Sequence, residues 1–365
     1  MKKLICAVFA SIFFLSAFCY PCSALNTSAQ SAVLIEAESG KIIYEKNANE
    51  KRGMASTTKI MTAITAIENC DIDKEVKVSD LAIGVEGSSI YLKKGESLTM
   101  EELLYALMLQ SANDAATAIA IDVSGSVEAF AELMNKKSED IGLGNTHFTN
   151  PHGLFDDGHY TTAKDLAMIT RYAMNNGIFR KLVSTERKVI PLNCDEGKRV
   201  LLNHNKLLKI YDGAVGVKTG FTKKTGRCLV SAAQKDGVTL IAVTLNAPDD
   251  WNDHRKMLDY GFERVICKTL AEPNSLSYKI PVVGGKKEYL TCTNCRGLKY
   301  VTVDENINIT SRVFVDRFYF APINNGEIIG HITYYNNGEE IGSLDLITTN
   351  AVDQKTVKKK FLGIF

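Results

Sequence analysis

A serine and a lysine three residues apart, Ser56 and Lys59, have the types and spacing best suited to chemistry in this chain. The residues after Lys59 are apolar on all sides of a helix, which indicates a buried helix with Ser56 in its first turn. Lys59 then lies on the same helix face as Ser56, at an N-terminus whose free N–H groups favour developing negative charge. Because burial favours the neutral amine, the pair predicts a general base beside a nucleophile.

The Ser-x-x-Lys spacing alone has little weight, since about one or two copies are expected by chance in a chain of this length. The alternative is that Ser56 caps the helix and Lys59 is a solvated helix residue. Further motifs must therefore support the hypothesis.

A second polar motif is Ser111-Ala112-Asn113, between two apolar segments that predict helices over 103–109 and 115–123. Small polar residues between two apolar helices indicate a tight turn that faces a cleft. The alternative is that Ser111 and Asn113 only cap the second helix.

A third motif, Lys218-Thr219-Gly220, continues a strand-like run that begins at residue 213. A strand holds side chains rigidly, and Gly220 allows a ligand to approach the backbone closely. Lys218 and Thr219 are therefore suited to bind a carboxylate. A second Lys-Thr-Gly at residues 224–226 falls in a turn and is predicted to be a solvated hairpin.

The elements that must position these motifs predict an α/β (α+β) fold. A hairpin over residues 32–44, a series of helices, three strands between 213 and 243 and a helix over 250–260 follow one another. Capping-box residues Thr99 and Glu102 mark one helix start. This order predicts an antiparallel sheet completed by both ends of the domain, with a helical cluster inserted.

Four segments divide the chain. Residues 1–24 have the basic, apolar and small-residue regions of a signal peptide, and residues 25–268 form the domain described above. Short alternating runs with Gly and Asn turns predict a small all-β domain over 275–350. Residues 351–365 join lysines to terminal apolar residues and suggest a basic amphipathic tail that could lie on an anionic membrane.

Composition narrows the functional classes. The chain has 365 residues, 45% hydrophobic and 23% charged, with a net charge of +1, which gives no reason to expect nucleic acid. The six histidines offer no metal cluster, and Cys292-Thr293-Asn294-Cys295 lacks a second pair for a zinc site. Free thiols or one local disulfide are expected there. We expect neither a metal nor a cofactor.

The order of the three motifs is that of the penicillin-recognising serine enzymes. Within that group the chain resembles the low-molecular-weight penicillin-binding proteins, the serine-type D-alanyl-D-alanine carboxypeptidases, over about residues 26–265. The family's β-lactamase/transpeptidase-like domain and second, β domain agree with the predicted fold. The segments that carry the resemblance are residues 54–62, 111–116, 149–154 and 217–222.

The resemblance implies an acyl-enzyme mechanism on peptidoglycan stem peptides. Ser56 attacks the carbonyl of the penultimate D-Ala, Lys59 takes the serine proton, and Ser111 helps to pass a proton to the leaving D-Ala. Backbone N–H groups of Ser56 and Phe221 hold the oxyanion. The substrate-binding residues are Asn113, Lys218, Thr219, Gly220 and Phe221, and β-lactams would acylate Ser56 and leave slowly.

Three alternatives remain open at this stage. A class A β-lactamase shares the motifs but needs an extra Glu, and the loop over 146–165 offers only Asp156, Asp157 and Asp165. A D,D-endopeptidase would use the same residues on a longer leaving group. A non-catalytic cell-wall-binding protein would be expected to lack a motif residue, and none is lost.

The predicted partners are the peptidoglycan stem peptide and β-lactam inhibitors, with peripheral membrane contact through the tail. The predicted location is outside the cytosol, at the outer face of the cytoplasmic membrane and the cell wall, in peptidoglycan biosynthesis and the control of cell shape. His152, His159 and His204 are interpreted as structural or loop histidines, because the mechanism already has its base.

Overall fold

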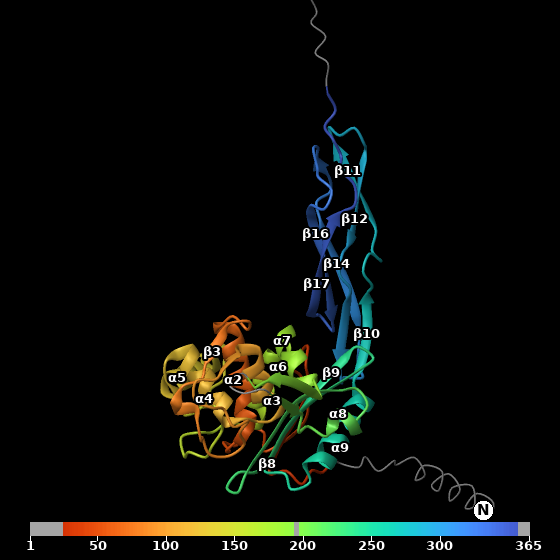
Figure 1. The fold of residues 1–365 in the computed structure, drawn as a ribbon. Helices are drawn as coiled ribbons and strands as arrows, with labels where there is room; N and C mark the ends of the chain where they lie inside the picture. Colours follow the sequence, from red (N-terminus) through yellow and green to blue (C-terminus); the bar gives the residue numbers. More distant parts are fainter. Residues whose placement is uncertain (1–24, 193–196, 357–365) are drawn as a thin grey trace, which may run out of the picture. The chain divides into compact units, whose positions relative to one another are not determined.

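The computed structural model describes residues 25–192 and 197–356, which form two compact units (Figure 1). A helix-rich unit contains the described residues within 1–34, 44–233 and 241–260. A β unit contains those within 35–43, 234–240 and 261–365. The predicted signal peptide and residues 357–365 of the predicted tail lie outside the described residues.

One five-stranded sheet has the order β2-β1-β9-β8-β7, so strands from the beginning and the end of the domain meet in it. The residue types at its β8–β9 turn explain the conformation of that turn. Asp236 and Gly237 join β8 to β9 with φ angles of 50° and 81°, as a tight hairpin turn requires. The antiparallel sheet predicted from the sequence is confirmed. The strands are β1 (Ser31–Glu36), β2 (Ile42–Lys46), β7 (Ala214–Thr222), β8 (Gly226–Lys235) and β9 (Val238–Leu245).

Between β2 and β7 the chain forms a cluster of helices, coloured orange to green in Figure 1. Helix α2 is buried from Lys59 through Ala66, which agrees with its apolar residues on all sides. The capping box of Thr99 and Glu102 starts α3 as predicted. The helices are η2 (Ala55–Thr58), α2 (Lys59–Asn69), η3 (Asp80–Ala82), α3 (Met100–Leu109), α4 (Asn113–Ser124), α5 (Val127–Asp140) and α6 (Ala163–Met174), and α9 (Asp250–Arg264) follows the last sheet strand.

Several short elements were not predicted from the sequence. They are α7 (Gly177–Ser184), α8 (Leu207–Ile210), the hairpin of β5 (Arg187–Pro191) and β6 (Lys198–Leu202), and the ladder of β3 (Glu75–Lys77) and β4 (Ser97–Thr99). All except α7, whose Phe179, Leu182 and Val183 form a buried face, are too short to give a clear hydrophobic period. Each buries few side chains, such as Ile190 and Leu201 in the hairpin, against the rest of the unit. Tertiary packing therefore decides their structure.

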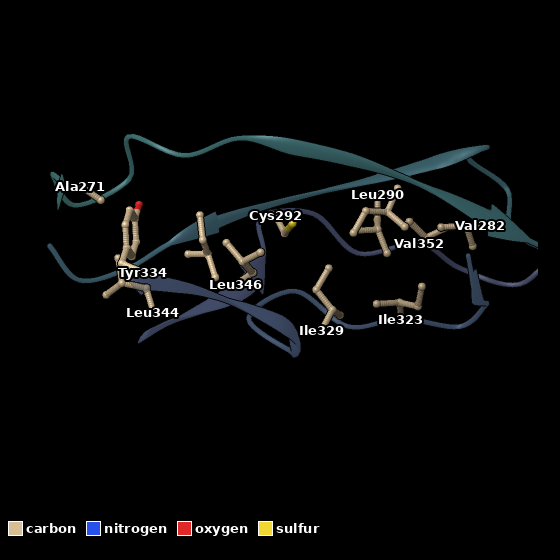
Figure 2. Close-up of a cluster of buried hydrophobic side chains, with 12 residues drawn as sticks. Ala271, Val282, Leu290, Cys292, Ile323, Ile329, Tyr334, Leu344, Leu346 and Val352 are labelled. Atoms are coloured by element: carbon tan, nitrogen blue, oxygen red, sulfur yellow. The ribbon is translucent and has the colours of Figure 1, made fainter. Parts of the chain in front are cut away.

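The β unit holds a six-stranded sheet of order β14-β16-β17-β12-β11-β15 and a separate β10–β13 ladder. Figure 2 shows its core, where Leu290, Cys292 and Leu346 pack against side chains such as Ile329 and Val352. The predicted all-β architecture is confirmed. The strands are β10 (Ile266–Ala271), β11 (Tyr278–Val283), β12 (Tyr289–Asn294), β13 (Leu298–Thr302), β14 (Ile309–Val315), β15 (Tyr319–Phe320), β16 (Ile328–Asn336) and β17 (Glu339–Thr348).

The structure also describes two cysteines of the β unit and the apolar length of the helices. Cys292 and Cys295 carry free thiols, one of the two states expected for them. Within residues 25–192 and 197–356, no helix is long and apolar enough to cross a membrane.

Candidate active site

Ser56 lies in the short helical turn η2, immediately before α2, and not in the first turn of α2 as predicted. The hydroxyls of Thr57 and Thr58 explain the tighter turn, because they donate to the carbonyl oxygens of Met54 (2.6 Å) and Ala55 (2.8 Å). Ala55 has a φ of 47°, a left-handed conformation that is strained for a residue with a Cβ. The nucleophile candidate therefore sits on a constrained, hydrogen-bonded turn.

Lys59 is fully buried and its Nζ lies 3.1 Å from Ser56 Oγ. The same Nζ donates to Asn113 Oδ1 (2.7 Å) and to the carbonyl oxygen of His152 (2.6 Å). Burial lowers the pKa of Lys59 well below its usual value, and the charge of Lys218 lowers it further. The interpretation of Lys59 as a solvated helix residue is wrong.

The three partners of Lys59 differ in what they can do. A backbone carbonyl and an amide oxygen only accept hydrogen bonds, whereas a serine hydroxyl both donates and accepts. A neutral amine has two N–H groups and one lone pair. In its neutral form, with its N–H groups on Asn113 and His152, Lys59 would direct its lone pair at Ser56 Oγ, which is the geometry for removing the serine proton.

Ser111 and Asn113 lie at the junction of α3 and α4, the interhelical turn predicted from the sequence. Helix α4 has Ala112 as its N-cap residue and no side-chain cap, so the interpretation of Ser111 and Asn113 as caps is wrong. Ser111 adopts a left-handed φ of 60°. Asn113 Nδ2 donates to Glu86 O (2.6 Å), which fixes the side-chain amide with its oxygen toward Lys59.

Lys218, Thr219 and Gly220 lie on β7, as predicted. Lys218 is buried, its Nζ donates to the carbonyl oxygen of Thr219 (3.0 Å), and burial lowers its pKa to about 7. A Cβ on Gly220 would lie 3.1 Å from the backbone nitrogen of Ser56, so the absence of a side chain lets β7 approach the turn more closely than another residue would. The second Lys-Thr-Gly lies at the β7–β8 turn, and the Lys224 side chain is 64% exposed.

A cleft of about 320 Å³ brings the motifs together, since Ser56, Ser111, Thr219, Gly220 and Phe221 all line it. Lys59, Asn113 and Lys218 are buried beside these lining residues. His204, interpreted from the sequence as a structural or loop histidine, also lines the cleft. The remaining lining residues were not predicted from the sequence and are Ser88, Arg227, Asp250 and Trp251.

The most informative of the missed residues is Arg227, a cation in the cleft lining on β8 beside Phe221. Its Nη2 lies 2.8 Å from Asp250 Oδ1, and its guanidinium lies 6.0 Å from the centre of the Trp251 ring. No short motif marks this group, because the pairing of β7 with β8 and the return of the chain at α9 create it. The signal was only an isolated arginine next to a recognised motif.

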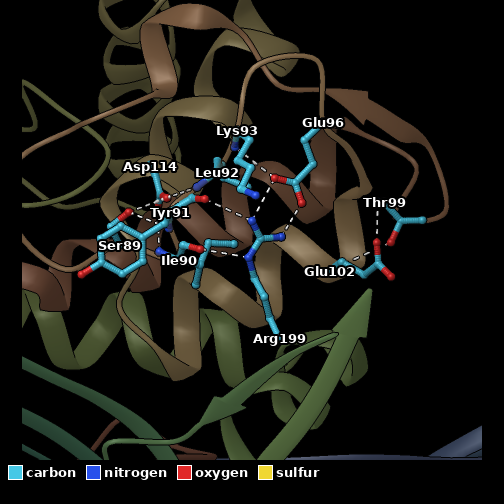
Figure 3. Close-up of polar contacts among 10 residues, drawn as sticks. All are labelled: Ser89, Ile90, Tyr91, Leu92, Lys93, Glu96, Thr99, Glu102, Asp114 and Arg199. Atoms are coloured by element: carbon cyan, nitrogen blue, oxygen red, sulfur yellow. Dashed lines mark hydrogen bonds and ion pairs between the residues drawn. The ribbon is translucent and has the colours of Figure 1, made fainter. Parts of the chain in front are cut away.

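A strap formed by residues 86–92 runs beside Asn113, and Figure 3 shows what holds it. The Asp114 carboxylate accepts from Ser89 Oγ (2.6 Å) and from the backbone nitrogens of Ile90 (3.2 Å) and Leu92 (3.0 Å). Arg199 donates to Ile90 O (2.9 Å) and forms an ion pair with the buried Glu96. The backbone of Asn113 completes the contact by donating to Ser88 O (2.7 Å).

Burial lowers the pKa of the histidines near the site, His204 included. His159 contacts Thr58 Oγ1 (2.8 Å) and accepts from the backbone of Thr149, and burial lowers its pKa to about 4. Burial likewise lowers the pKa of His152 to about 3. Among the described residues, no group of three or more His, Cys, Asp or Glu side chains is arranged to hold a metal.

Comparison with known proteins identifies the family. The family model described as D-alanyl-D-alanine carboxypeptidase matches residues 20–249, and the model of the penicillin-binding protein 5 C-terminal domain matches residues 267–354. The chain belongs to the D-alanyl-D-alanine carboxypeptidase family. The predictions of a serine-type peptidase and of the penicillin-binding protein family are confirmed.

Individual relatives align with most of this chain. It is 36% identical to D-alanyl-D-alanine carboxypeptidase DacF of Bacillus subtilis, over 87% of this chain and 84% of the relative. It is 30% identical to DacC of Escherichia coli, over 90% of this chain and 85% of the relative. The solved penicillin-binding protein 5 of Haemophilus influenzae superposes with a TM-score of 0.66 at 27% identity, covering 90% of this chain and 98% of that one.

Proposed function

We propose that this enzyme removes the terminal D-Ala from peptidoglycan stem peptides through an acyl-enzyme on Ser56. The observation that carries the proposal is the buried Lys59 amine, 3.1 Å from Ser56 Oγ, with its other two partners able only to accept. Family membership supplies the substrate class, because the relatives are named D-alanyl-D-alanine carboxypeptidases.

Acylation begins when Ser56 Oγ attacks the carbonyl carbon of the penultimate D-Ala and its proton passes to Lys59 Nζ. The oxyanion accepts hydrogen bonds from the backbone N–H groups of Ser56 and Phe221, which both line the cleft. When the intermediate collapses, the C–N bond breaks and the leaving amine receives a proton through Ser111. Water then hydrolyses the ester and restores Ser56.

The substrate is held by groups on both sides of Ser56. Asn113 binds the substrate amide, while Lys218 and Thr219 bind the terminal carboxylate. Arg227 adds a second cation in the same cleft lining, oriented by Asp250 and Trp251. A β-lactam occupies the same position and acylates Ser56.

The carboxylates of the 146–165 loop support slow deacylation and disfavour the β-lactamase alternative. Asp165 accepts from Asn145 N (3.0 Å) and Thr146 Oγ1 (2.9 Å), and Asp156 accepts from Gly158 N (2.8 Å). The Asp157 side chain is exposed and lies 3.6 Å from Lys224. None of these three carboxylates lines the cleft, so none is placed to activate a deacylating water there.

Intact-protein mass after incubation with penicillin tests the proposal. We expect a stable adduct on the wild type and none on Ser56→Ala, while Ser88→Ala, which changes another hydroxyl of the same cleft, still forms the adduct. Release of D-Ala from a stem peptide identifies the reaction. Rapid loss of penicillin without an adduct would indicate a β-lactamase, and neither adduct nor drug loss would refute the role of Ser56.

The cellular setting is part of the proposal. The signal-like sequence of residues 1–24 and the family's action on cell-wall peptides support export to the outer face of the cytoplasmic membrane. The lysines and apolar residues of the tail support peripheral contact with that membrane.

A further inference from the structure

We infer that the β unit carries its own lipid-contacting surface, an exit patch formed by Val283, Phe318 and Phe320. These side chains are exposed to 46%, 48% and 68% respectively. A contiguous exposed apolar group of this kind marks an interaction surface. The inference rests on the proposed membrane contact of the tail and adds a second, independent contact from the folded chain.

The three side chains are neighbours in the fold. Val283 on β11 pairs in parallel register with Phe320 on β15, and Ala321 N donates to Val283 O (3.0 Å). The rings of Phe318 and Phe320 meet edge to face with centroids 5.4 Å apart. The patch is therefore one surface supported by paired strands.

The described chain ends next to the exit patch, which supports a lipid bilayer as its binding partner. Lys355 N donates to the carbonyl oxygen of Gly284 (2.8 Å), directly after Val283, and Gly285 forms a bridge with Gln354. The next residues, Val357-Lys358-Lys359-Lys360-Phe361-Leu362-Gly363-Ile364-Phe365, combine cations with apolar side chains. The described chain therefore ends beside the exit patch.

The charges near the patch fit an anionic lipid surface. Exposed Lys286, Lys287 and Arg317 lie within a few residues of the patch in sequence, together with Glu288 and Asp316. Lys355 lies beside the patch through its backbone hydrogen bond to Gly284, Lys286 pairs with Asp353 (3.1 Å), and the tail adds three lysines. Phenylalanine rings that enter the headgroup region, with cations around them, are the combination that binds interfacial segments to anionic bilayers. We therefore assign the patch to the bilayer on which the tail lies.

Vesicle co-sedimentation of the mature full-length protein tests the inference. The double variant Phe318→Ser/Phe320→Ser should partition at least about tenfold less onto phosphatidylglycerol-containing vesicles than the wild type, because embedded apolar area drives the binding. Phe314→Ser is the matched control. Phe314 is a phenylalanine of similar exposure (43%) on β14, but its ring stacks on His331 (centroids 4.8 Å apart) and not on the rings of the patch. It should partition like the wild type.

A chain that ends at Thr356 separates the patch from the tail. We expect weaker binding than the full chain, and a further loss when the two phenylalanines are also replaced. If the double variant binds like the wild type, the exit patch is refuted while the tail contact stands. If no form binds vesicles, both membrane contacts are refuted. Penicillin acylation of every variant reports the enzymatic proposal separately.

Discussion

Substitution of Gly220 by alanine should slow acylation without unfolding the protein. The new Cβ would lie 3.1 Å from the backbone nitrogens of Ser56 and Thr57 and 3.2 Å from the carbonyl oxygen of Met54. All three are backbone atoms of the turn that carries the nucleophile, so no side chain can rotate away. Strand β7 and the turn must separate by a few tenths of an ångström.

The expected loss of acylation rate follows from the displacement of the Ser56 backbone N–H. Ser56 N is a proposed oxyanion donor, and loss of one such donor costs about 10²- to 10³-fold in rate. A partial displacement should therefore reduce the acylation rate about 30- to 100-fold, which corresponds to roughly 2–3 kcal/mol of transition-state stabilisation. The overpacking itself should cost about 1–3 kcal/mol of folding free energy.

Acylation by a fluorescent penicillin gives the rate, and thermal denaturation gives the stability. Gly144→Ala is the matched control, since a Cβ there meets no heavy atom within 4 Å, and it should leave both quantities unchanged. An acylation rate for Gly220→Ala within about threefold of the wild type would refute the argument. So would an equal slowing by Gly144→Ala.

Three further outcomes follow from the same geometry. The pH profile of kcat/KM should be bell-shaped. Acylation falls at low pH because Lys59 regains its proton. Substrate binding weakens as the pH rises through about 7, because Lys218 in the free enzyme then loses its charge. Arg227→Gln should raise KM for the peptide about tenfold with little change in kcat, measured as D-Ala release. Arg199→Met should lower the acylation rate about tenfold, because it loosens the strap beside Asn113. Arg199→Lys should restore part of the rate. An unchanged acylation rate in Arg199→Met would contradict this positioning role.

The sequence predicted those parts of the fold and of the site that depend on neighbours in the chain. Apolar residues on all sides of α2 and the capping box at Thr99 are local signals, and both were confirmed. Lys59 at the start of α2, Ser111 and Asn113 at the α3–α4 junction, and Lys218 to Gly220 on β7 also lie where the sequence placed them, whereas Ser56 lies in the turn before α2. Their surroundings along the chain fix their backbone.

The parts that sequence analysis missed depend on contacts between distant residues. Arg199 and Glu96 are 103 positions apart, and neither residue type is expected in a buried site without its partner. Arg227 and Asp250 meet only because β8, β9 and α9 return the chain to the cleft. The turn that holds Ser56 was predicted as α-helix because hydroxyl-to-carbonyl bonds compete with helix geometry without changing the apolar pattern.

The two buried lysines give the proposed site a further property. Lys59 must be neutral to accept the serine proton, whereas Lys218 must be charged to bind a carboxylate, and both are buried in the same site. The charge of Lys218 lowers the pKa of Lys59. A bound substrate carboxylate favours the charged form of Lys218, which opposes its loss of a proton near pH 7. Binding of the correct substrate end therefore keeps Lys218 charged next to the base. The carboxylate itself acts on Lys59 in the opposite direction, so in the complex the neutral state of the base depends on burial, the largest cause of its lowered pKa, together with the charge of Lys218.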